Sequence, residues 1–125
     1  MCVLLVEDNP LIRMLLAEEL RDAGFDVVEA ITGDKAIDLI ENSLIVFTAL
    51  VTDLHMPGRT NGAGVAALMR EKWPSIPVII ASGRPDVFKP IWEQDLDYTL
   101  LSKPFATSKL VKMVQDLTGK RDAVI

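Results

Sequence analysis

Short runs of apolar residues alternate along the chain with longer stretches in which apolar residues return at every third or fourth position. The short runs are rich in β-branched residues and are typical of buried strands, whereas the longer spacing is typical of amphipathic helices. The pattern predicts strands at residues 2–6, 25–30, 45–53, 77–82 and 97–102. It predicts helices at residues 10–24, 34–42, 64–73 and 107–119.

A further helical segment is expected at residues 87–95. Pro90 lies inside it and lacks the backbone N–H that a helix interior needs, so this segment is expected to be short or irregular. Residues 1–120 contain no repeat and no linker and are expected to form one domain. A frayed tail is expected at residues 121–125.

Strands that alternate with helices form a parallel sheet, and right-handed crossovers place the helices on both of its faces. The segments CVLLV, FTALV and PVIIA are apolar nearly throughout, as expected of strands that are covered on both sides. The sequence therefore predicts an α/β fold with a doubly wound five-stranded parallel sheet. In such folds a ligand site forms at the carboxyl ends of the strands, where the winding direction reverses.

Composition narrows the choice of partners. Half of the 125 residues are hydrophobic and the net charge is -5, which argues against direct binding to nucleic acid or to an anionic membrane surface. Cys2 is the single cysteine, so the chain forms no internal disulfide and an intracellular protein is expected. The first residues are apolar but lack a basic start and turn acidic at Glu7, unlike a secretory signal or a membrane span. We therefore expect a cytoplasmic protein.

Polar residues stand at the ends of four of the five expected strands. They are Glu7 and Asp8 after the first, Asp53 at the end of the third, Ser82 at the end of the fourth and Lys103 after the fifth. Crowded carboxylates repel one another unless a cation neutralises them. Oxygen ligands without a His or Cys cluster suit Mg²⁺, which also binds phosphate oxygens. The sequence therefore predicts Mg²⁺ as cofactor, with Lys103 and Ser82 binding an anionic group beside it.

A carboxylate can itself attack a phosphoryl group and form an aspartyl phosphate, and Asp53 is the candidate for this role. The same residues also have ordinary structural interpretations. Asp8 or Asn9 could cap the next helix, and Ser82 could be a simple turn residue. Their joint occurrence at successive strand ends favours a functional site.

Four segments resemble the receiver domain of two-component response regulators in their order and spacing: VED (6–8), DLHMPG (53–58), ASG (81–83) and KPF (103–105). The resemblance covers nearly the whole chain. It implies a flavodoxin-like receiver fold with strand order 2-1-3-4-5. It also implies that Asp53 accepts a phosphoryl group from a sensor histidine kinase or a histidine phosphotransfer protein.

The resemblance further implies a Mg²⁺ site made of Asp8, Asp53, the backbone carbonyl of His55 and, through a bound water, Glu7. Lys103 would contact the phosphoryl group, and Ser82 would move toward it. The domain would catalyse only its own phosphorylation and slow dephosphorylation, so it is not expected to be an enzyme for other substrates.

Two features depart from the family pattern. Receivers usually carry an aromatic residue three positions before the lysine of the fifth strand, where this chain has Leu100; Tyr98 comes two residues too early. The turn at residues 58–64 is slightly longer than usual, and its glycines indicate a flexible flap near Asp53. The family's output face, formed by the fourth helix, fifth strand and fifth helix, would therefore signal without the usual ring.

The leading hypothesis is a phospho-accepting receiver with an unknown downstream protein target, working as a stand-alone regulator or as the receiver of a hybrid kinase. Leu100 motivates an alternative, a receiver-like adaptor that binds proteins without being phosphorylated. A flavodoxin-like enzyme is disfavoured, because FMN binding needs a loop rich in glycine and hydroxyls where this chain has EDNP.

Overall fold

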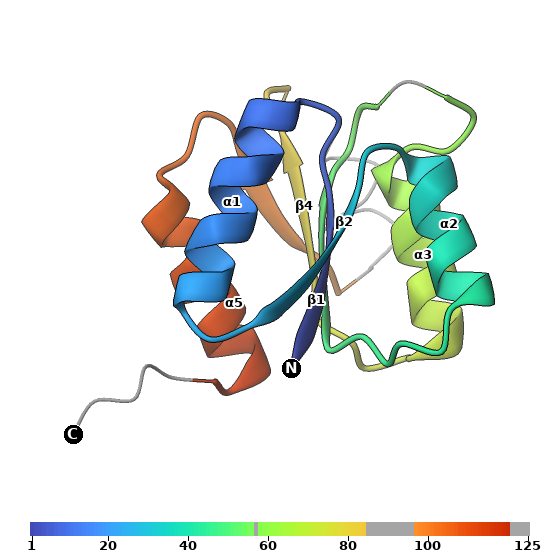
Figure 1. Cartoon of the computed structure of the whole chain (residues 1–125). Helices are drawn as coiled ribbons and strands as arrows, with labels where there is room; N and C mark the ends of the chain where they lie inside the picture. Colours follow the sequence, from blue (N-terminus) through green and yellow to red (C-terminus); the bar gives the residue numbers. More distant parts are fainter. Residues whose placement is uncertain (57, 85–96, 121–125) are drawn as a thin grey trace.

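The computed structural model describes residues 1–56, 58–84 and 97–120. These residues form a parallel sheet in the order β2-β1-β3-β4-β5, with helices on both faces (Figure 1). The strands are β1 (Cys2–Val6), β2 (Asp26–Ala30), β3 (Ala49–Asp53), β4 (Val78–Ser82) and β5 (Thr99–Ser102). The helices are α1 (Pro10–Asp22), α2 (Gly33–Asn42), α3 (Gly62–Lys72) and α5 (Thr107–Thr118). The predicted doubly wound fold and its strand order are confirmed, whereas the expected segment at 87–95 and the tail at 121–125 lie outside the described residues.

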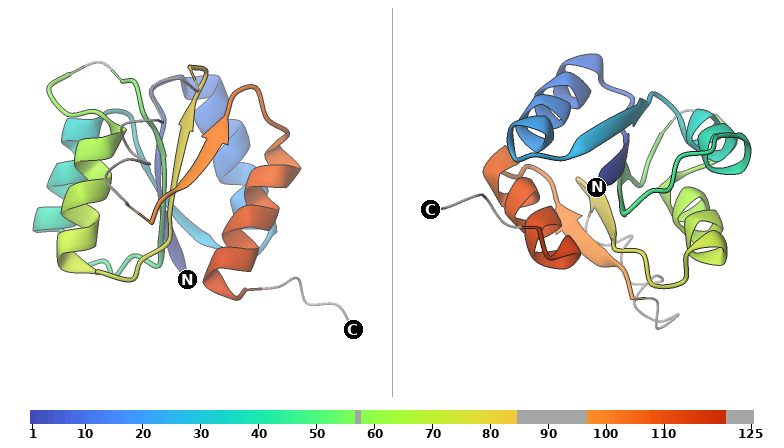
Figure 2. Two further views of the ribbon diagram at one scale, coloured as in Figure 1. Left: turned by 180° about the vertical axis from the view of Figure 1, so that it is seen from behind. Right: turned by 60° about the horizontal axis from the view of Figure 1, so that its bottom comes forward.

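The sheet reverses its winding direction between β1 and β3. The chain runs from β1 to the edge strand β2 and then returns past β1 to β3, β4 and β5. Helices α1 and α5 pack on one face, and α2 and α3 on the other (Figure 2). Val6 of β1 lies opposite Thr52 of β3, so the residues that follow these two strands share one rim of the sheet. This is the place where a ligand site is expected.

Two apolar cores hold this rim in place. The central strands β3 and β4 are buried along their whole length. Because successive side chains point to opposite faces, Leu50 and Ile80 pack toward α2 and α3, while Val51 and Ile79 pack toward α1 and α5. Burying a side chain of this size is worth about 1.5–3 kcal/mol. Within the described residues, no helix is long and apolar enough to cross a membrane.

The expected strand at 45–53 is too long, because β3 begins at Ala49. Val46 is 67% exposed, whereas Phe47 is buried and meets the ring of Trp73 edge to face at 6.0 Å. Residues 45–48 therefore form a connection rather than a strand, and the apolar run there reflects the anchoring of Phe47 on the α3 side of the sheet.

Helix α3 begins at Gly62, earlier than the predicted start at residue 64. Asn61 is its N-cap and accepts a hydrogen bond of 3.0 Å from the N–H of Gly64. The N–H of Gly62 donates to the carbonyl of Leu54 at 2.9 Å. A Cβ at position 62 would collide with the carbonyl oxygen of Asp53. The absence of a side chain at Gly62 thus lets α3 start directly against the end of β3.

Replacing Gly62 by alanine should destabilise the fold by about 1–3 kcal/mol, because the added methyl group overpacks against backbone that cannot move aside. Gly64→Ala is the matched control, since its methyl would meet side-chain atoms rather than backbone, namely those of Thr60 and Asn61. This control should be neutral or should gain up to about 1 kcal/mol from helix propensity. Urea unfolding measures both, and equal stability of the two variants would contradict the close-approach argument.

Candidate functional site

Three carboxylates meet at the rim between β1 and β3. Glu7 and Asp8 follow β1, and Asp53 is the last residue of β3. Each offers an oxygen, and these oxygens lie within 4.8 Å of one another. Glu7 and Asp53 are buried, whereas Asp8 is exposed. The predicted carboxylate cluster is therefore formed, with one side open to solvent.

Asn9, rather than Asp8, caps α1. Its side-chain oxygen accepts hydrogen bonds from the backbone N–H groups of Leu11 and Ile12 at 3.0 and 3.2 Å. The Asp8 carboxylate is consequently left for the rim, and the interpretation of Asp8 as a helix cap is wrong.

The ammonium of Lys103 enters the carboxylate cluster from the loop that follows β5. Its Nζ forms an ion pair with Oδ1 of Asp53 and lies 3.8 Å from Oε2 of Glu7. The backbone N–H of Lys103 donates to the carbonyl of Ser82 at 2.8 Å, which ties this loop to the end of β4. The side chain of Lys103 is 31% exposed, so the ammonium lies between the buried acids and solvent.

The charged form of the Glu7 carboxyl is disfavoured at this place. Burial raises the pKa of its carboxyl to about 8, and the hydrogen bond and negative charge of Asp53 act in the same direction. The ammonium of Lys103 and the backbone N–H of Asn9 oppose this rise in pKa but do not cancel it. Without a bound cation, Glu7 therefore keeps its proton at neutral pH.

Ser82 and His55 take different places on the rim. Ser82 is buried at the end of β4, and its hydroxyl accepts a hydrogen bond of 3.0 Å from the backbone N–H of Arg84. The hydroxyl is thus tied to the loop after β4. His55 is exposed just beyond β3. The role of its carbonyl stays a prediction.

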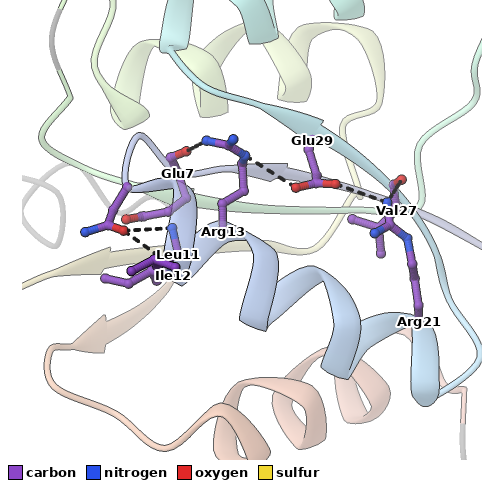
Figure 3. A network of polar contacts seen from close by, with 8 residues as sticks. Glu7, Leu11, Ile12, Arg13, Arg21, Val27 and Glu29 are labelled. Carbon is purple, nitrogen blue, oxygen red and sulfur yellow. Dashed lines mark hydrogen bonds and ion pairs between the residues drawn. The ribbon is translucent and has the colours of Figure 1, made fainter.

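Arg13, at the end of the first turn of α1, also contacts the site, although the sequence pattern does not indicate it. Its Nη1 donates a hydrogen bond of 3.0 Å to the backbone carbonyl of Glu7 (Figure 3). An arginine in an amphipathic helix resembles an ordinary surface charge. The available signal is its position, because helical side chains lean toward the N-terminus and this one leans toward the acidic pair.

A doubly wound parallel sheet with three carboxylates clustered at its reversal point is the arrangement expected of a receiver-type α/β domain. The chain matches the family model of the response regulator receiver domain over residues 3–115, and it belongs to that family. It is therefore a receiver domain of two-component systems, in which receivers pair with histidine kinases and bind Mg²⁺ at an acidic pocket.

Individual relatives come from different protein architectures. The chain is 30% identical over 115 residues to an NtrX-like response regulator of Rickettsia typhi, covering 90% of this chain and 24% of that protein. It is 31% identical over 121 residues to the sensor kinase CckA of Brucella abortus, covering 96% of this chain and 13% of that protein. The chain thus spans a quarter or less of the length of these relatives.

Two solved structures show the same fold. A response regulator receiver protein from Sinorhizobium medicae superposes with a TM-score of 0.85 at 29% identity, covering 95% of this chain and 94% of that one. The response regulator TrrA from Thermotoga maritima, solved in complex with Mg²⁺ and BeF, superposes with a TM-score of 0.77 at 27% identity. The coverage is 93% of this chain and 97% of that one.

The residues at the rim fit a hard divalent cation. The cluster of Glu7, Asp8 and Asp53 offers carboxylate oxygens only, and Mg²⁺ prefers one or two carboxylates together with waters and phosphate oxygens. The raised pKa of Glu7 points the same way, because a buried acid next to another acid is relieved by a positive charge.

The pKa of Glu7 predicts how stability changes with pH when Mg²⁺ is removed by EDTA. The folded-state pKa of about 8 exceeds the ordinary value of 4.5, so the fold favours the protonated acid. Below about pH 4.5 both states are protonated, and stability falls as the pH rises toward about 8, where the folded state also loses the proton. Glu7→Gln, which resembles the protonated acid, should lack this fall.

Thermal unfolding of the wild type and of Glu7→Gln in EDTA, between about pH 5 and about pH 9, measures the difference in their stability. This difference should grow with pH to the order of a few kcal/mol in favour of Glu7→Gln. Added Mg²⁺ should stabilise the wild type more at the alkaline end, because a cation must displace the proton. Parallel curves for the two proteins in EDTA would contradict the assignment.

Proposed function

We propose that this chain is a phospho-accepting receiver in which Asp53 takes a phosphoryl group from a sensor histidine kinase or a histidine phosphotransfer protein. The observation that supports this most is the setting of Asp53, a buried carboxylate paired with Lys103 and gathered with Glu7 and Asp8. A fixed carboxylate beside a fixed ammonium is suited to nucleophilic attack on phosphorus. The chain would accelerate only its own phosphorylation and slow dephosphorylation.

The proposed transfer needs only Asp53 and the phosphohistidine of the donor as reacting groups. A carboxylate oxygen of Asp53 attacks the phosphorus of the phosphohistidine, and the P–N bond breaks. The leaving imidazole nitrogen keeps the bonding electrons and takes up a proton, and an acyl phosphate remains on Asp53. Lys103 already contacts Oδ1 of Asp53, so its ammonium would follow the charge onto the new phosphoryl oxygens. Attack by water would later release phosphate and restore Asp53.

Asp8 and Asp53 would hold Mg²⁺ directly, the backbone carbonyl of His55 would complete the protein ligands, and Glu7 would act through a water. When bound, Mg²⁺ would neutralise the excess negative charge and polarise the phosphoryl oxygens. The oxygen-only cluster supports this assignment. The crystal structure of the related response regulator TrrA, which was solved in complex with Mg²⁺ and BeF, supports it too.

The switch would act through Ser82. Its hydroxyl now accepts from the N–H of Arg84 at 3.0 Å and donates to the carbonyl of Arg84 at 3.4 Å. On phosphorylation the O–H would turn from this carbonyl to a phosphoryl oxygen. The N–H of Arg84 would keep its bond to the hydroxyl, so the backbone at Arg84 would follow the serine. Phosphorylation adds nearly two negative charges and several acceptor oxygens, which is enough to bias a loop between two states. The output face would include β5 and α5.

An apolar surface beside the rim would receive the donor protein. Leu15 of α1 is 52% exposed, and Leu11 and Met14 are exposed beside it. A groove of about 520 Å³ adjoins this surface, and its lining includes Ile12, Leu15, Leu16, Lys103, Pro104 and Phe105. Because Lys103 borders both the groove and Asp53, a helix with an apolar stripe that fills the groove would bring its phosphohistidine to Asp53.

The wider setting is also a proposal. The relatives include a response regulator and a sensor kinase that are both longer than this chain, so it would work either as a stand-alone regulator or as the receiver of a hybrid kinase. We propose a bacterial, cytoplasmic protein that touches neither nucleic acid nor membrane directly, consistent with its net charge of -5. Its downstream protein target is unknown.

A phosphorylation-independent adaptor is the second candidate, and Leu100 favours it. This residue lies in β5 opposite Ile80 and is partly buried against the core on the α3 side. An aliphatic side chain there offers no ring to expose. Partner binding that persists unchanged in Asp53→Ala would support the adaptor over the switch.

Acetyl phosphate with Mg²⁺ should add one phosphoryl group to the wild-type chain, measured by intact-protein mass spectrometry. Asp53→Asn should remain unlabelled, because an amide lacks the nucleophilic oxygen, and EDTA should abolish labelling of the wild type. Asp38→Asn, which removes an exposed acid of α2, is the matched control and should label normally. Labelling of Asp53→Asn at the wild-type level would refute the phosphoacceptor assignment.

Leu15→Ala should slow phosphotransfer from a histidine kinase without affecting labelling by acetyl phosphate, because the small donor needs no docking surface. A lost apolar contact of about 1–2 kcal/mol corresponds to roughly a 5- to 30-fold slower transfer at limiting protein. The donor would be the kinase that labels the wild-type chain fastest in a panel of purified histidine kinases.

Leu44→Ala is the control for this experiment. Leu44 is fully exposed in the connection that leads into β3, at the opposite end of the sheet. Its loss should leave both reactions unchanged. Equal rates for Leu15→Ala and wild type with the kinase would remove the groove as the docking surface.

A further inference from the structure

Arg13 connects the edge of the sheet to the acidic loop. Its Nη1 donates to the carbonyl of Glu7 at 3.0 Å, and its Nε lies 3.3 Å from Oε1 of Glu29 on β2. Figure 3 shows the guanidinium between these two groups. The side chain is only 18% exposed. One planar group therefore holds two elements in a fixed relation.

The orientation of Arg13 is itself supported. The second oxygen of Glu29 accepts from Nη2 of Arg21 at 3.2 Å, and this Nη2 also donates to the carbonyl of Val27 at 3.1 Å. Two arginines from α1 thus hold the two oxygens of one carboxylate (Figure 3). A guanidinium has a rigid set of donors that suits such bridging, whereas a lysine ammonium does not.

These contacts restrain the backbone on both sides of Asp8. The backbone of Glu7 is held on both sides, because its N–H donates to the carbonyl of Ala30 at 3.1 Å and its carbonyl accepts from Arg13. On the other side of Asp8, Asn9 is fixed by its hydrogen bonds at the start of α1. Asp8 is therefore suspended between two anchored residues. Without Arg13, the peptide between Glu7 and Asp8 loses one of these restraints.

We propose that Arg13 is a positioning residue for the cation site: through the carbonyl of Glu7 it keeps the carboxylates of Glu7 and Asp8 in reach of Asp53. Glu29 and Arg21 orient Arg13 from the β2 side. This inference rests on the proposed function, in which these carboxylates hold Mg²⁺. Residues that orient metal ligands typically change metal affinity 10- to 100-fold when they are removed.

The loss of positive charge at Arg13 and the loss of its positioning role should change Mg²⁺ affinity in opposite directions. Removing a positive charge next to a cation site should tighten Mg²⁺ binding. The geometric role predicts weaker binding, because the carboxylates lose their fixed arrangement. The sign of the change in affinity therefore separates positioning from a simple charge effect.

The test compares Arg13→Ala with Arg70→Ala. Arg70 likewise holds two segments with one guanidinium, here through the backbone carbonyls of Ile76 and Asp97 at 2.7 and 2.8 Å, but at the amino ends of β4 and β5. Both variants lose one charge and one arginine clamp, so both should lower the thermal unfolding temperature. Only Arg13→Ala should weaken Mg²⁺ binding, by about 10-fold or more, measured by NMR titration of the Asp8 and Asp53 amides with MgCl₂.

Two further measurements complete the test. Arg13→Lys keeps the charge but cannot hold both partners, so it should bind Mg²⁺ with an intermediate affinity and covers the case in which Arg13→Ala fails to fold. At saturating Mg²⁺, labelling of Arg13→Ala by acetyl phosphate should approach the wild-type rate, because the defect is in affinity. Unchanged or tighter Mg²⁺ binding by Arg13→Ala, or an equal loss in Arg70→Ala, overturns the positioning role. A wild-type chain that binds no Mg²⁺ overturns the proposed function itself.

Discussion

The ion pair between Lys103 and Asp53 is the interaction on which the rest of the rim depends. Two buried carboxylates side by side are strongly unfavourable unless a positive charge or a proton neutralises them. Lys103 serves both, because its ammonium contacts Asp53 and lies near Glu7. Glu7 supplies the remaining compensation by keeping a proton, as its raised pKa shows. The cluster is thus stabilised by the ammonium of Lys103 and by the proton on Glu7.

The loop beyond Asp53 is tied to the other half of the molecule. The carboxylate of Asp34 accepts a hydrogen bond of 3.2 Å from the N–H of Arg59, and its bond with Thr60 is the main reason why its pKa is lowered. A Cβ at Gly33 would collide with the carbonyl of Thr60, so the start of α2 and the loop are in direct backbone contact. Among the glycines at residues 58–64, Gly62 permits a second close approach, that of α3 to the carbonyl of Asp53; the expected flexibility of this turn stays a prediction. The longer turn is therefore anchored at both α2 and β3.

The sequence sufficed for the centre of the fold and for the cluster because both follow from local pattern. Apolar runs such as residues 77–82 identify buried strands, and parallel strands deliver their carboxyl ends to one rim. What the pattern misses depends on contacts between distant segments. The apolar run at residues 45–48 resembles a strand in the sequence, but Phe47 is apolar because it packs against Trp73. Arg13 looks like a surface charge until Glu7 and Glu29 are seen beside it.

The proposed output face, which includes β5 and α5, has Leu100 where an aromatic residue is usual, so the energy of a switch there would come from a different source. Tyr98 directly precedes β5 and packs against the same core as Leu100, but Arg70 stacks over its ring at 5.2 Å and binds the carbonyl of Asp97. Tyr98 is thus fixed to α3 at the end of β5 remote from Lys103, and cannot replace the missing ring. Any change that reaches this face through β5 must act on the packing of Leu100.

An aliphatic side chain makes no hydrogen bond that could be exchanged between two states, so its two positions differ mainly in the apolar surface that they bury. That surface is worth about 25 cal/mol per Å². A tenfold shift between two states requires about 1.4 kcal/mol, which corresponds to roughly 55 Å² of leucine surface covered or uncovered. A shift of that size uses a large part of one leucine side chain. A switch that signals through Leu100 would therefore have to move this side chain between a packed and an open position, or draw the rest of its energy from a protein that binds the face.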